Sequence, residues 1–322
     1  MRRCKRLISL GLAAMLVLLL VSGCGGHSKS SDSYEAYYNR IEKKTKSEYR
    51  GMAEDLAVVQ DKNGTTAGTV SADYADLCID DTDNKVLVAY HCFDKRYPAS
   101  ITKVMTALLT LEHGHLDDKI TLKHDIVLGE EGAVISSLKK GDTVTVSQVL
   151  HTMLIKSAND CAVILGEYIA GSEDAFVDMM NAKAKELGAT HTHFVNPNGL
   201  HDDNHYTTAY DLYLIFKAAC KYDTFQDIVS SKDYTMTYTN SAGMKVNEYM
   251  ESTNYYLLNE YPLPEGVTMY GGKTGTTSLA KSCLIVMTKN KAGHRFFSVV
   301  LGAEDKDQLY RSMSKLLQKT VK

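Results

Sequence analysis

Residues 96–109 have the sequence RYPASITKVMTALL. After Ser100, apolar residues recur at the three- and four-residue spacing of a buried helix face: Ile101, Val104, Met105, Leu108 and Leu109. Pro98 favours an extended backbone before this helix, which places Ser100 beside the unpaired amides of the first turn. Lys103 follows three residues later and is predicted to lie on the same face as Ser100.

A lysine in the first turn of a buried helix needs an explanation, because lysines are almost never fully buried without a partner. One interpretation is that the Lys103 stem is buried while its ammonium reaches water. The other is that Lys103 is a general base for Ser100. Desolvation and a second cation would lower its pKa for that role, and Lys273 is the candidate cation.

The Ser-x-x-Lys spacing is not specific by itself, because it occurs five times in the chain. The other four copies begin at Ser136, Ser137, Ser278 and Ser312. The copies at Ser136 and Ser137 run into two lysines and Gly141, which predicts a solvated turn. No helical apolar stripe is evident after Ser278 or Ser312, so Ser100 is the candidate nucleophile.

A second motif, Ser157-Ala158-Asn159, lies between two apolar helical stretches at 146–154 and 161–168. It is therefore predicted to lie on a helix–helix connection that faces a cleft. The same Ser-x-Asn spacing recurs at Ser252, and the sequence around Ser157 also matches an ordinary helix N-cap. Its combination with the other motifs favours a functional role.

A third motif, Lys273-Thr274-Gly275, occurs once, within the sequence YGGKTGTT at 270–277. Apolar runs follow at 283–287 and 296–301, so the motif is predicted to lie on a sheet strand whose small residues allow a close approach. A ligand that pairs its backbone with this strand would explain the glycines. A glycine-rich hairpin without function is the alternative.

In this order along the chain, the three motifs resemble the signature of the serine enzymes that react with penicillin. Further segments extend the resemblance: RYPA at 96–99, FVNPNGLH at 194–201, HYTTAYD at 205–211 and VVLGA at 299–303. From about Ala72 onward, the chain is similar to the low-molecular-mass penicillin-binding proteins, which are serine-type D-alanyl-D-alanine carboxypeptidases. The resemblance implies an α+β fold of the β-lactamase/transpeptidase type, with a five-stranded antiparallel sheet flanked by helices and a helical subdomain.

The resemblance also implies a reaction. Ser100 would be the acylated nucleophile, Lys103 its base, and Ser157 the relay that gives a proton to the departing D-alanine. The enzyme would remove the terminal D-alanine from peptidoglycan stem pentapeptides through an acyl-enzyme, and β-lactams would inhibit it. A D,D-endopeptidase of the same fold is the alternative. No cofactor is implied.

Substrate binding is assigned by the same resemblance. Asn159 would bind the substrate amide and steady the catalytic lysine, and Lys273 and Thr274 would hold the terminal carboxylate. The backbone amides of Ser100 and Thr276 would form the oxyanion hole. Class A β-lactamases deacylate with a glutamate beyond the Ser-x-Asn motif, whereas residues 199–204 here contain none, so a long-lived penicilloyl-enzyme is expected.

The N-terminus predicts an extracytoplasmic, membrane-anchored protein. Four basic residues precede an apolar run at 7–21, which is typical of a signal peptide, and the following Cys24 completes a sequence that resembles a bacterial lipobox. We expect a lipoprotein signal peptide over 1–23, a flexible tether over 24–50 and the catalytic domain over 51–322. An uncleaved anchor with a chance cysteine is the alternative.

Charge and cysteine content limit the remaining possibilities. Residues 1–23 hold four positive and no negative charges, so their removal lowers the formal net charge from −3 to −7 and disfavours a nucleic-acid partner. Five cysteines then remain besides Cys24 and lie in apolar stretches, which predicts buried free thiols.

Local patterns predict the order of the elements. Strands at 77–79 and 86–90 should form a hairpin, and helices should fill about 100–220, with a capping box that begins at Thr208. Later elements are expected as strands near 234–239, 267–274, 282–289 and 294–302, then a closing helix over about 304–318. Strands from both ends of the chain around a helical middle indicate an α+β fold.

Two rival hypotheses remain. One is a zinc-dependent D,D-peptidase, because histidines and aspartates gather within 15 residues: His191, His193, His201, Asp202, Asp203 and His205. The other is a non-catalytic penicillin-binding wall protein. The complete set of serine-motif residues favours the serine enzyme over both.

Overall fold

The computed structural model describes residues 56–59 and 73–321. The chain divides into two units, residues 1–55 and 56–322, and every element described below belongs to the second unit. Within the described ranges, no helix is long and apolar enough to span a bilayer.

The predictions for the N-terminus concern residues that the structure does not describe. The signal peptide over 1–23, the lipidated Cys24 and the tether over 24–50 all lie outside the described residues. They stay predictions.

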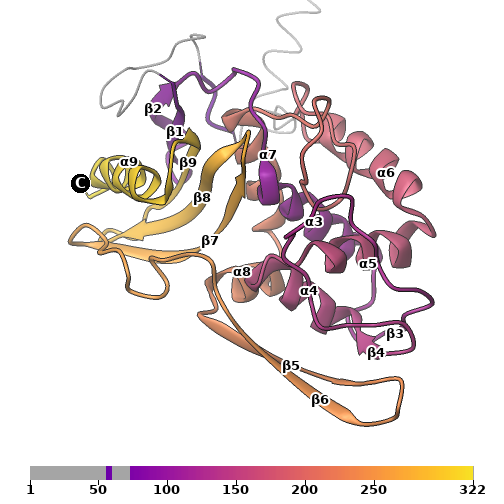
Figure 1. Ribbon diagram of the computed structural model, residues 1–322. Coiled ribbons are helices and arrows are strands. Elements are labelled where there is room, and N and C mark those ends of the chain that lie inside the picture. The colour runs from indigo at the N-terminus through magenta and orange to yellow at the C-terminus, as the bar shows by residue number, and fades with distance from the viewer. Residues whose placement is uncertain (1–55, 60–72, 322) are drawn as a thin grey trace, which may run out of the picture. The chain divides into compact units, whose positions relative to one another are not determined.

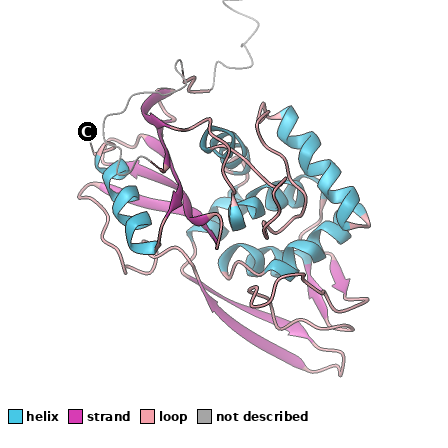
Figure 2. Ribbon diagram, turned by 45° about the horizontal axis from the view of Figure 1, so that its top comes forward, coloured by secondary structure: helices cyan, strands magenta, loops and turns pink. Residues whose placement is uncertain are grey.

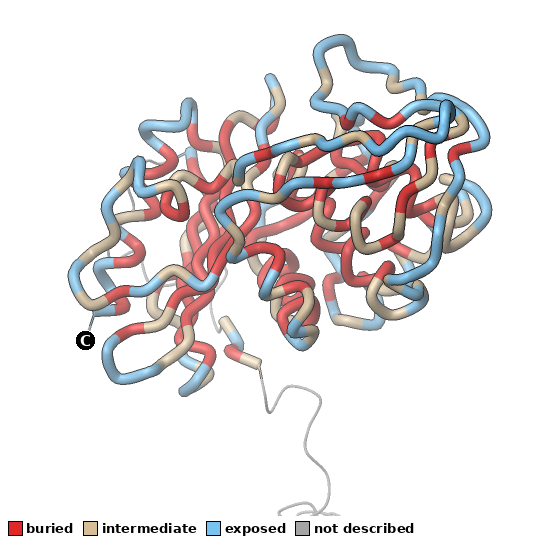
Figure 3. The backbone as a smooth tube through the Cα atoms, turned by 90° about the horizontal axis from the view of Figure 1, so that it is seen from below, coloured by how far each residue is buried: buried red, intermediate tan, exposed pale blue. Residues whose placement is uncertain are grey.

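The centre of the second unit is a five-stranded antiparallel sheet, as the resemblance implied (Figure 1). Its strands, in spatial order, are β2 (Lys85–Tyr90), β1 (Ala75–Asp80), β9 (Arg295–Ala303), β8 (Lys281–Asn290) and β7 (Val267–Thr277). The three central strands are buried on both faces, which explains their nearly continuous apolar sequences. Figure 3 shows this burial along the sheet. The N-terminal hairpin therefore pairs with the last strand of the chain.

The two faces of the sheet pack against different helices (Figure 2). On one face lies α9 (Lys306–Gln318), whose Leu309, Met313 and Leu316 are buried against the strands. On the other lie α7 (Ala209–Ala219), which contacts β9 and β1, and α8 (Asp223–Ser230), which contacts β7. This second face is continuous with the core of the helical part.

The helical part follows the prediction in part, because the stretches 114–145 and 187–208 contain no α-helix. Its elements are a short 3₁₀ turn η1 (Ala99–Thr102) and the helices α3 (Lys103–His113), α4 (Val146–Ile155), α5 (Asn159–Ala170) and α6 (Glu173–Glu186). The predicted capping box at Thr208 is half right. The Thr208 hydroxyl accepts from the Asp211 amide and caps α7, but the Asp211 carboxylate accepts from the His191 amide and the Thr192 hydroxyl instead.

A second sheet was not predicted. It consists of β3 (Lys119–Thr121), β4 (Thr143–Thr145), β5 (Asp233–Thr239) and β6 (Lys245–Glu251), in this spatial order. The strand expected near 234–239 is therefore real but lies in this second sheet, as one arm of a long hairpin that projects below the helices in Figure 1. Alternation along one strand does not specify its partner, because pairing with β4 depends on residues about 90 positions earlier in the chain.

Two local predictions have different outcomes. The turn at Ser136 is not solvated. Ser136 is 4% exposed, and its hydroxyl donates to the Asp160 carboxylate at 2.5 Å, which the local sequence could not reveal. By contrast, the predicted free and buried thiols are confirmed: Cys78, Cys92, Cys161, Cys220 and Cys283.

Asp76 on β1 is a buried carboxyl group at the sheet–α9 interface. It lies between Tyr74 and Cys78, which face α9, and neither of its oxygens has a hydrogen-bond partner among the described residues. Burial raises the pKa of Asp76 to about 7. The ionised form is therefore unfavourable in the folded state.

We expect the contribution of Asp76 to the free energy of unfolding to be most favourable below pH 4 and to become less favourable as the pH rises toward 7, because the unfolded chain ionises first. Asp76→Asn should remove this dependence and stabilise the protein at pH 8 by roughly 2–4 kcal/mol. Urea unfolding at pH 4 and pH 8 measures the effect, with the exposed Asp178→Asn as control. Equal stabilities of the wild type and Asp76→Asn at pH 8 would contradict it.

Candidate active site

Ser100 lies in the tight turn η1, immediately before the buried helix α3, where the sequence placed it. Two glycines pack closely against this turn. A Cβ at Gly275 would lie 2.8 Å from the Pro98 carbonyl oxygen and 3.0 Å from the Ser100 nitrogen. A Cβ at Gly199 would lie 1.9 Å from the Ala99 carbonyl oxygen. Glycine at both positions therefore lets β7 and the loop that contains Gly199 fix the position of Ser100.

Lys103 is fully buried, with 0% exposure, which excludes an ammonium in water. Its Nζ lies 2.8 Å from Ser100 Oγ, 2.8 Å from Asn159 Oδ1 and 2.7 Å from the Asn198 carbonyl oxygen. Burial and the charge of Lys273 hold the pKa of Lys103 well below its usual value. The two carbonyl-type oxygens can only accept, so a neutral amine donates to both and turns its lone pair toward the Ser100 hydroxyl.

Ser157 lies on the predicted connection between α4 and α5, and Asn159 is the first residue of α5. The alternative, that Ser157-Ala158-Asn159 is an ordinary helix N-cap, is not observed. The N-cap residue of α5 is Ala158, and no side chain caps this helix. Ser157 has a φ of 66°, a left-handed conformation that turns the chain sharply before α5. The Asn159 amide nitrogen donates to the Val134 carbonyl at 3.0 Å, which orients its oxygen toward Lys103.

Lys273 is the second buried cation, with 1% exposure. Its Nζ donates to Ser157 Oγ at 2.9 Å and to the Thr274 carbonyl at 2.9 Å. Burial lowers the pKa of Lys273 to about 7. Lys103 and Lys273 thus each contact one serine of the site, and the structure brings the residues of all three motifs together.

These residues surround a cavity of about 610 Å³. Its lining includes Ser100, Ser157, Asn159, Thr274 and Thr276. The stretch from Thr274 to Thr277 belongs to β7, which is an edge strand of the central sheet. One side of its backbone is therefore unpaired in the sheet and is available to an extended ligand.

Sequence reasoning missed two contributors to the site. The Asn198 carbonyl fixes Lys103, although its segment NPNGL was noted only as part of the resemblance. Thr253 Oγ1 lies 2.5 Å from Thr274 Oγ1, so the second Ser-x-Asn copy, at Ser252, borders the cavity as well. No local pattern marks either contact, because both join residues distant in the sequence.

Two histidines of the zinc hypothesis, His205 and His193, contact groups outside the proposed set of ligands. His205 is 2% exposed, and its Nε2 lies 2.8 Å from Oγ1 of Thr102, which belongs to the turn η1 that holds Ser100. Burial lowers the pKa of His205 to about 3, which favours the neutral ring. His193 Nδ1 lies 2.7 Å from the Asn204 carbonyl oxygen, so both rings support the loop structure.

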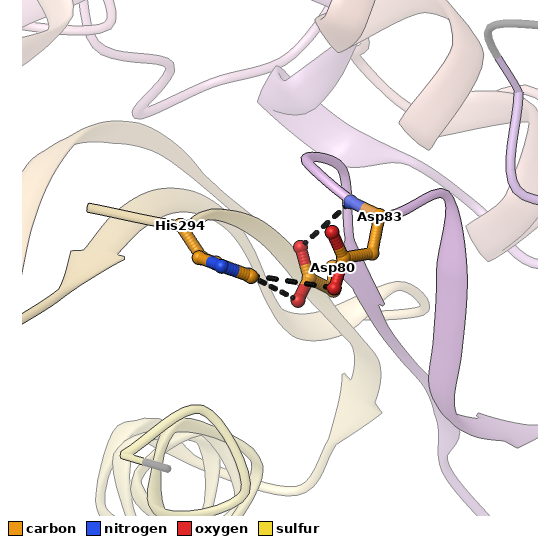
Figure 4. A group of neighbouring side chains, drawn as sticks. All are labelled: Asp80, Asp83 and His294. Carbon is orange, nitrogen blue, oxygen red and sulfur yellow. Dashed lines mark hydrogen bonds and ion pairs between the residues drawn. The ribbon is translucent and has the colours of Figure 1, made fainter. Parts of the chain in front are cut away.

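The group of potential metal ligands found among the described residues lies elsewhere, at the turns of two hairpins (Figure 4). Asp80 Oδ1 accepts from the amides of Thr82 and Asp83, and Asp80 Oδ2 lies 2.9 Å from His294 Nδ1. The contact with Asp80 raises the pKa of His294. Hydrogen bonds and an ion pair that join the two turns account for this group.

The comparison with known proteins agrees with this geometry. Residues 61–305 match the model of the D-alanyl-D-alanine carboxypeptidase family. The chain belongs to this family. The carboxypeptidase DacF of Bacillus subtilis is 36% identical over 247 residues, which are 75% of this chain and 60% of DacF. The carboxypeptidase DacC of Escherichia coli is 30% identical over 251 residues, which are 75% of this chain and 59% of DacC.

A solved structure confirms the expected fold. The DD-transpeptidase of Streptomyces K15 superimposes with a TM-score of 0.69 at 25% identity, over 81% of this chain and 99% of that protein. The chain thus has the fold of a DD-peptidase in full, whereas its match spans about 60% of the length of the first two curated relatives.

Proposed function

We propose that this protein is a serine-type D-Ala-D-Ala carboxypeptidase that removes the terminal D-alanine from peptidoglycan stem pentapeptides. The observation that carries the proposal is the contact between a fully buried Lys103 and Ser100 Oγ at 2.8 Å, at the edge of a cavity large enough for a peptide end. A buried amine with a lowered pKa is the base that a serine nucleophile requires.

In the acylation step, Ser100 Oγ attacks the carbonyl carbon of the penultimate D-alanine, and its proton passes to the neutral Lys103 amine. The backbone amides of Ser100 and Thr276 stabilise the oxyanion of the tetrahedral intermediate. When the intermediate collapses, Ser157 gives a proton to the amine of the departing D-alanine and recovers one from the Lys273 ammonium, 2.9 Å away. The products are an ester on Ser100 and free D-alanine.

Before deacylation, Lys103 loses its proton to solvent and Lys273 regains one, so both lysines return to their starting states. In the deacylation step, a water molecule attacks the ester carbonyl and gives a proton to the neutral Lys103, which passes it to Ser100 Oγ as the ester bond breaks. Ser100 leaves as the alcohol, and the shortened peptide carries the new carboxylate. The substrate backbone would pair with the free edge of β7, with Asn159 bound to its amide. The Thr274 hydroxyl would bind the terminal carboxylate in the field of the buried Lys273 below it.

The same step explains inhibition by β-lactams. The amide of the four-membered ring would acylate Ser100, but its amine stays attached and blocks the approach of water. No glutamate occurs at 199–204, and Glu167 lies within α5, where its carboxylate is 3.2 Å from His124 Nε2. A long-lived penicilloyl-enzyme is therefore part of the proposal.

The proposal places the enzyme outside the cytoplasm. A lipid on Cys24, after removal of residues 1–23, would anchor it to the membrane, and residues 24–50 would connect the anchor to a catalytic domain over 51–322. Its partners would be stem peptides that end in D-Ala-D-Ala. Nucleic acid is not a proposed partner.

A digest of purified muropeptides, followed by mass spectrometry, tests the reaction. We expect pentapeptide stems to lose the mass of one alanine, with no change in the cross-linked dimers. Cleavage of the dimers would instead identify a D,D-endopeptidase. Chelator treatment should leave the rate unchanged, whereas a loss that zinc restores would identify the metal enzyme.

A further inference from the structure

A second cavity adjoins the catalytic one. It has a volume of about 600 Å³, and two residues, Glu130 and Leu200, line both cavities. The lining of the catalytic cavity follows β7 from Thr274 to Thr277, and the next residue, Ser278, lines the second cavity. The edge strand β7 therefore leads from one cavity into the other.

The proposed function determines which part of a substrate reaches the second cavity. Thr274 would bind the terminal carboxylate and the Thr276 amide the oxygen of the scissile carbonyl, so the acyl part of the peptide continues along β7 toward Ser278. Extended residues advance about 3.3 Å each along a strand. Ser278, two positions beyond Thr276, is therefore level with the residue that precedes the penultimate D-alanine. In a stem pentapeptide this is the third residue, a diamino acid whose side-chain amine forms cross-links.

The second cavity offers negative charge to such an amine. Its lining holds two glutamates, Glu130 and Glu173, and no lysine or arginine belongs to the lining that the described residues form. His201 lines it as well, but its Nε2 lies 3.3 Å from the Asp203 carboxylate. The electrostatic field in this cavity therefore favours an ammonium group.

Glu173 is the partly buried member of the pair. It lies in the first turn of α6, and in the part of the chain that the structure describes neither Glu173 nor Glu130 forms an ion pair. Burial raises the pKa of Glu173, and the neighbouring acids Asp174 and Glu167 raise it further. A cation bound in the cavity would stabilise the ionised carboxylate, so Glu173 gains from an ammonium ligand.

Asn198 gives independent evidence for a peptide ligand. It is 3% exposed and lines the second cavity. Its side-chain oxygen accepts from the Leu200 amide at 2.9 Å, whereas its side-chain nitrogen donates to no group among the described residues. A buried donor without an acceptor is costly, and a carbonyl oxygen of a bound peptide would satisfy it. Because the Asn198 carbonyl accepts from Lys103, the same residue joins the second cavity to the base.

We propose that the second cavity is the subsite for the third residue of the stem, where Glu173 and Glu130 recognise its free side-chain amine. The inference rests on the proposed function and specifies its substrate. An amine that already forms a cross-link is an uncharged amide, so the enzyme acts on stems before they are cross-linked. Within the described ranges neither glutamate hydrogen-bonds to Ser100 or Lys103, so both act on substrate binding.

The test compares two peptides, Nα-acetyl-L-Lys-D-Ala-D-Ala with a free ε-amine and the same peptide acetylated at that amine. We expect kcat/KM to be roughly tenfold higher for the free amine, mainly through KM. The double variant Glu173→Gln/Glu130→Gln should lower this ratio to about one. Asp174→Asn/Glu131→Gln is the matched control and should keep the wild-type ratio, because these exposed neighbours line neither cavity.

A binding measurement separates this inference from the proposed reaction. In the Ser100→Ala background, which cannot be acylated, calorimetry should give a Kd roughly tenfold lower for the free-amine peptide, and substitution of both glutamates should remove the difference. Equal Kd values for the two peptides, or a difference that survives the substitutions, would overturn the subsite and leave the proposed function in place. Selective binding by a wild type that never releases D-alanine would overturn the proposed function and support the subsite.

Discussion

Ser100→Ala is expected to abolish covalent labelling by penicillin, with a loss of at least about a thousandfold in acylation rate. No other hydroxyl is predicted to replace it. Ser157 Oγ is the nearest candidate by role, but its partner is Lys273, which donates to it and therefore does not act as its base. A fluorescent penicillin and a denaturing gel measure the effect.

Two other Ser-x-x-Lys serines provide matched controls. Ser312 is buried in α9, and Ser136 is bound to Asp160. Ser312→Ala and Ser136→Ala should label at the wild-type rate in the folded protein, although Ser136→Ala should lower the thermal midpoint, because it removes a buried hydrogen bond to a carboxylate. Labelling of Ser100→Ala at the wild-type rate would contradict the assignment of Ser100 as the nucleophile.

Lys273→Ala should slow acylation by about 30-fold to several thousand-fold, since truncation of one partner in a desolvated charged contact typically costs about 2–5 kcal/mol. Two effects combine. Ser157 loses the ammonium that returns its proton. The positive electrostatic field that favours binding of the substrate carboxylate at Thr274 is lost as well. Lys156→Ala is the control, because Lys156 lines the same cavity but contacts Glu248.

The pH profile identifies the electrostatic part of this loss. The Lys273 charge is one of the causes that lower the pKa of Lys103, so its removal should raise that pKa. A base with a higher pKa is protonated over a wider range, and the acid limb of the acylation profile should therefore move to higher pH. Lys156→Ala should leave the limb in place, because Lys156 pairs with Glu248. An unmoved limb in Lys273→Ala would mean that Lys273 supports the strand without acting on Lys103.

Much of the site could be predicted because its parts carry local signals. The apolar stripe after Ser100 marks a buried helix, and the packing of that helix against the rest of the core forces Lys103 to be buried. The two apolar runs on either side of Ser157 are enough to predict a helix–helix connection. The small residues around Lys273 indicate a strand that is approached closely, and the Cβ contact at Gly275 is the physical reason.

The rest depends on contacts between distant residues, which local patterns do not encode. The Asn198 carbonyl acts on Lys103 from 95 positions away, and the partner of β5 lies in a strand of three residues. The lysines that follow Ser136 predicted a solvated turn. The partner that its hydroxyl has in the buried turn, the Asp160 carboxylate, comes 24 residues later and leaves no local signal. Short strands and carbonyl oxygens leave no periodic signal.

Peptide mapping of the penicillin adduct tests the central claim most directly. The wild-type protein is treated with penicillin, digested and analysed by mass spectrometry. We predict a single adduct with the full mass of the antibiotic, on the peptide that contains Ser100, and slow loss of this mass over time. An adduct on another serine, or no covalent mass at all, would contradict the account.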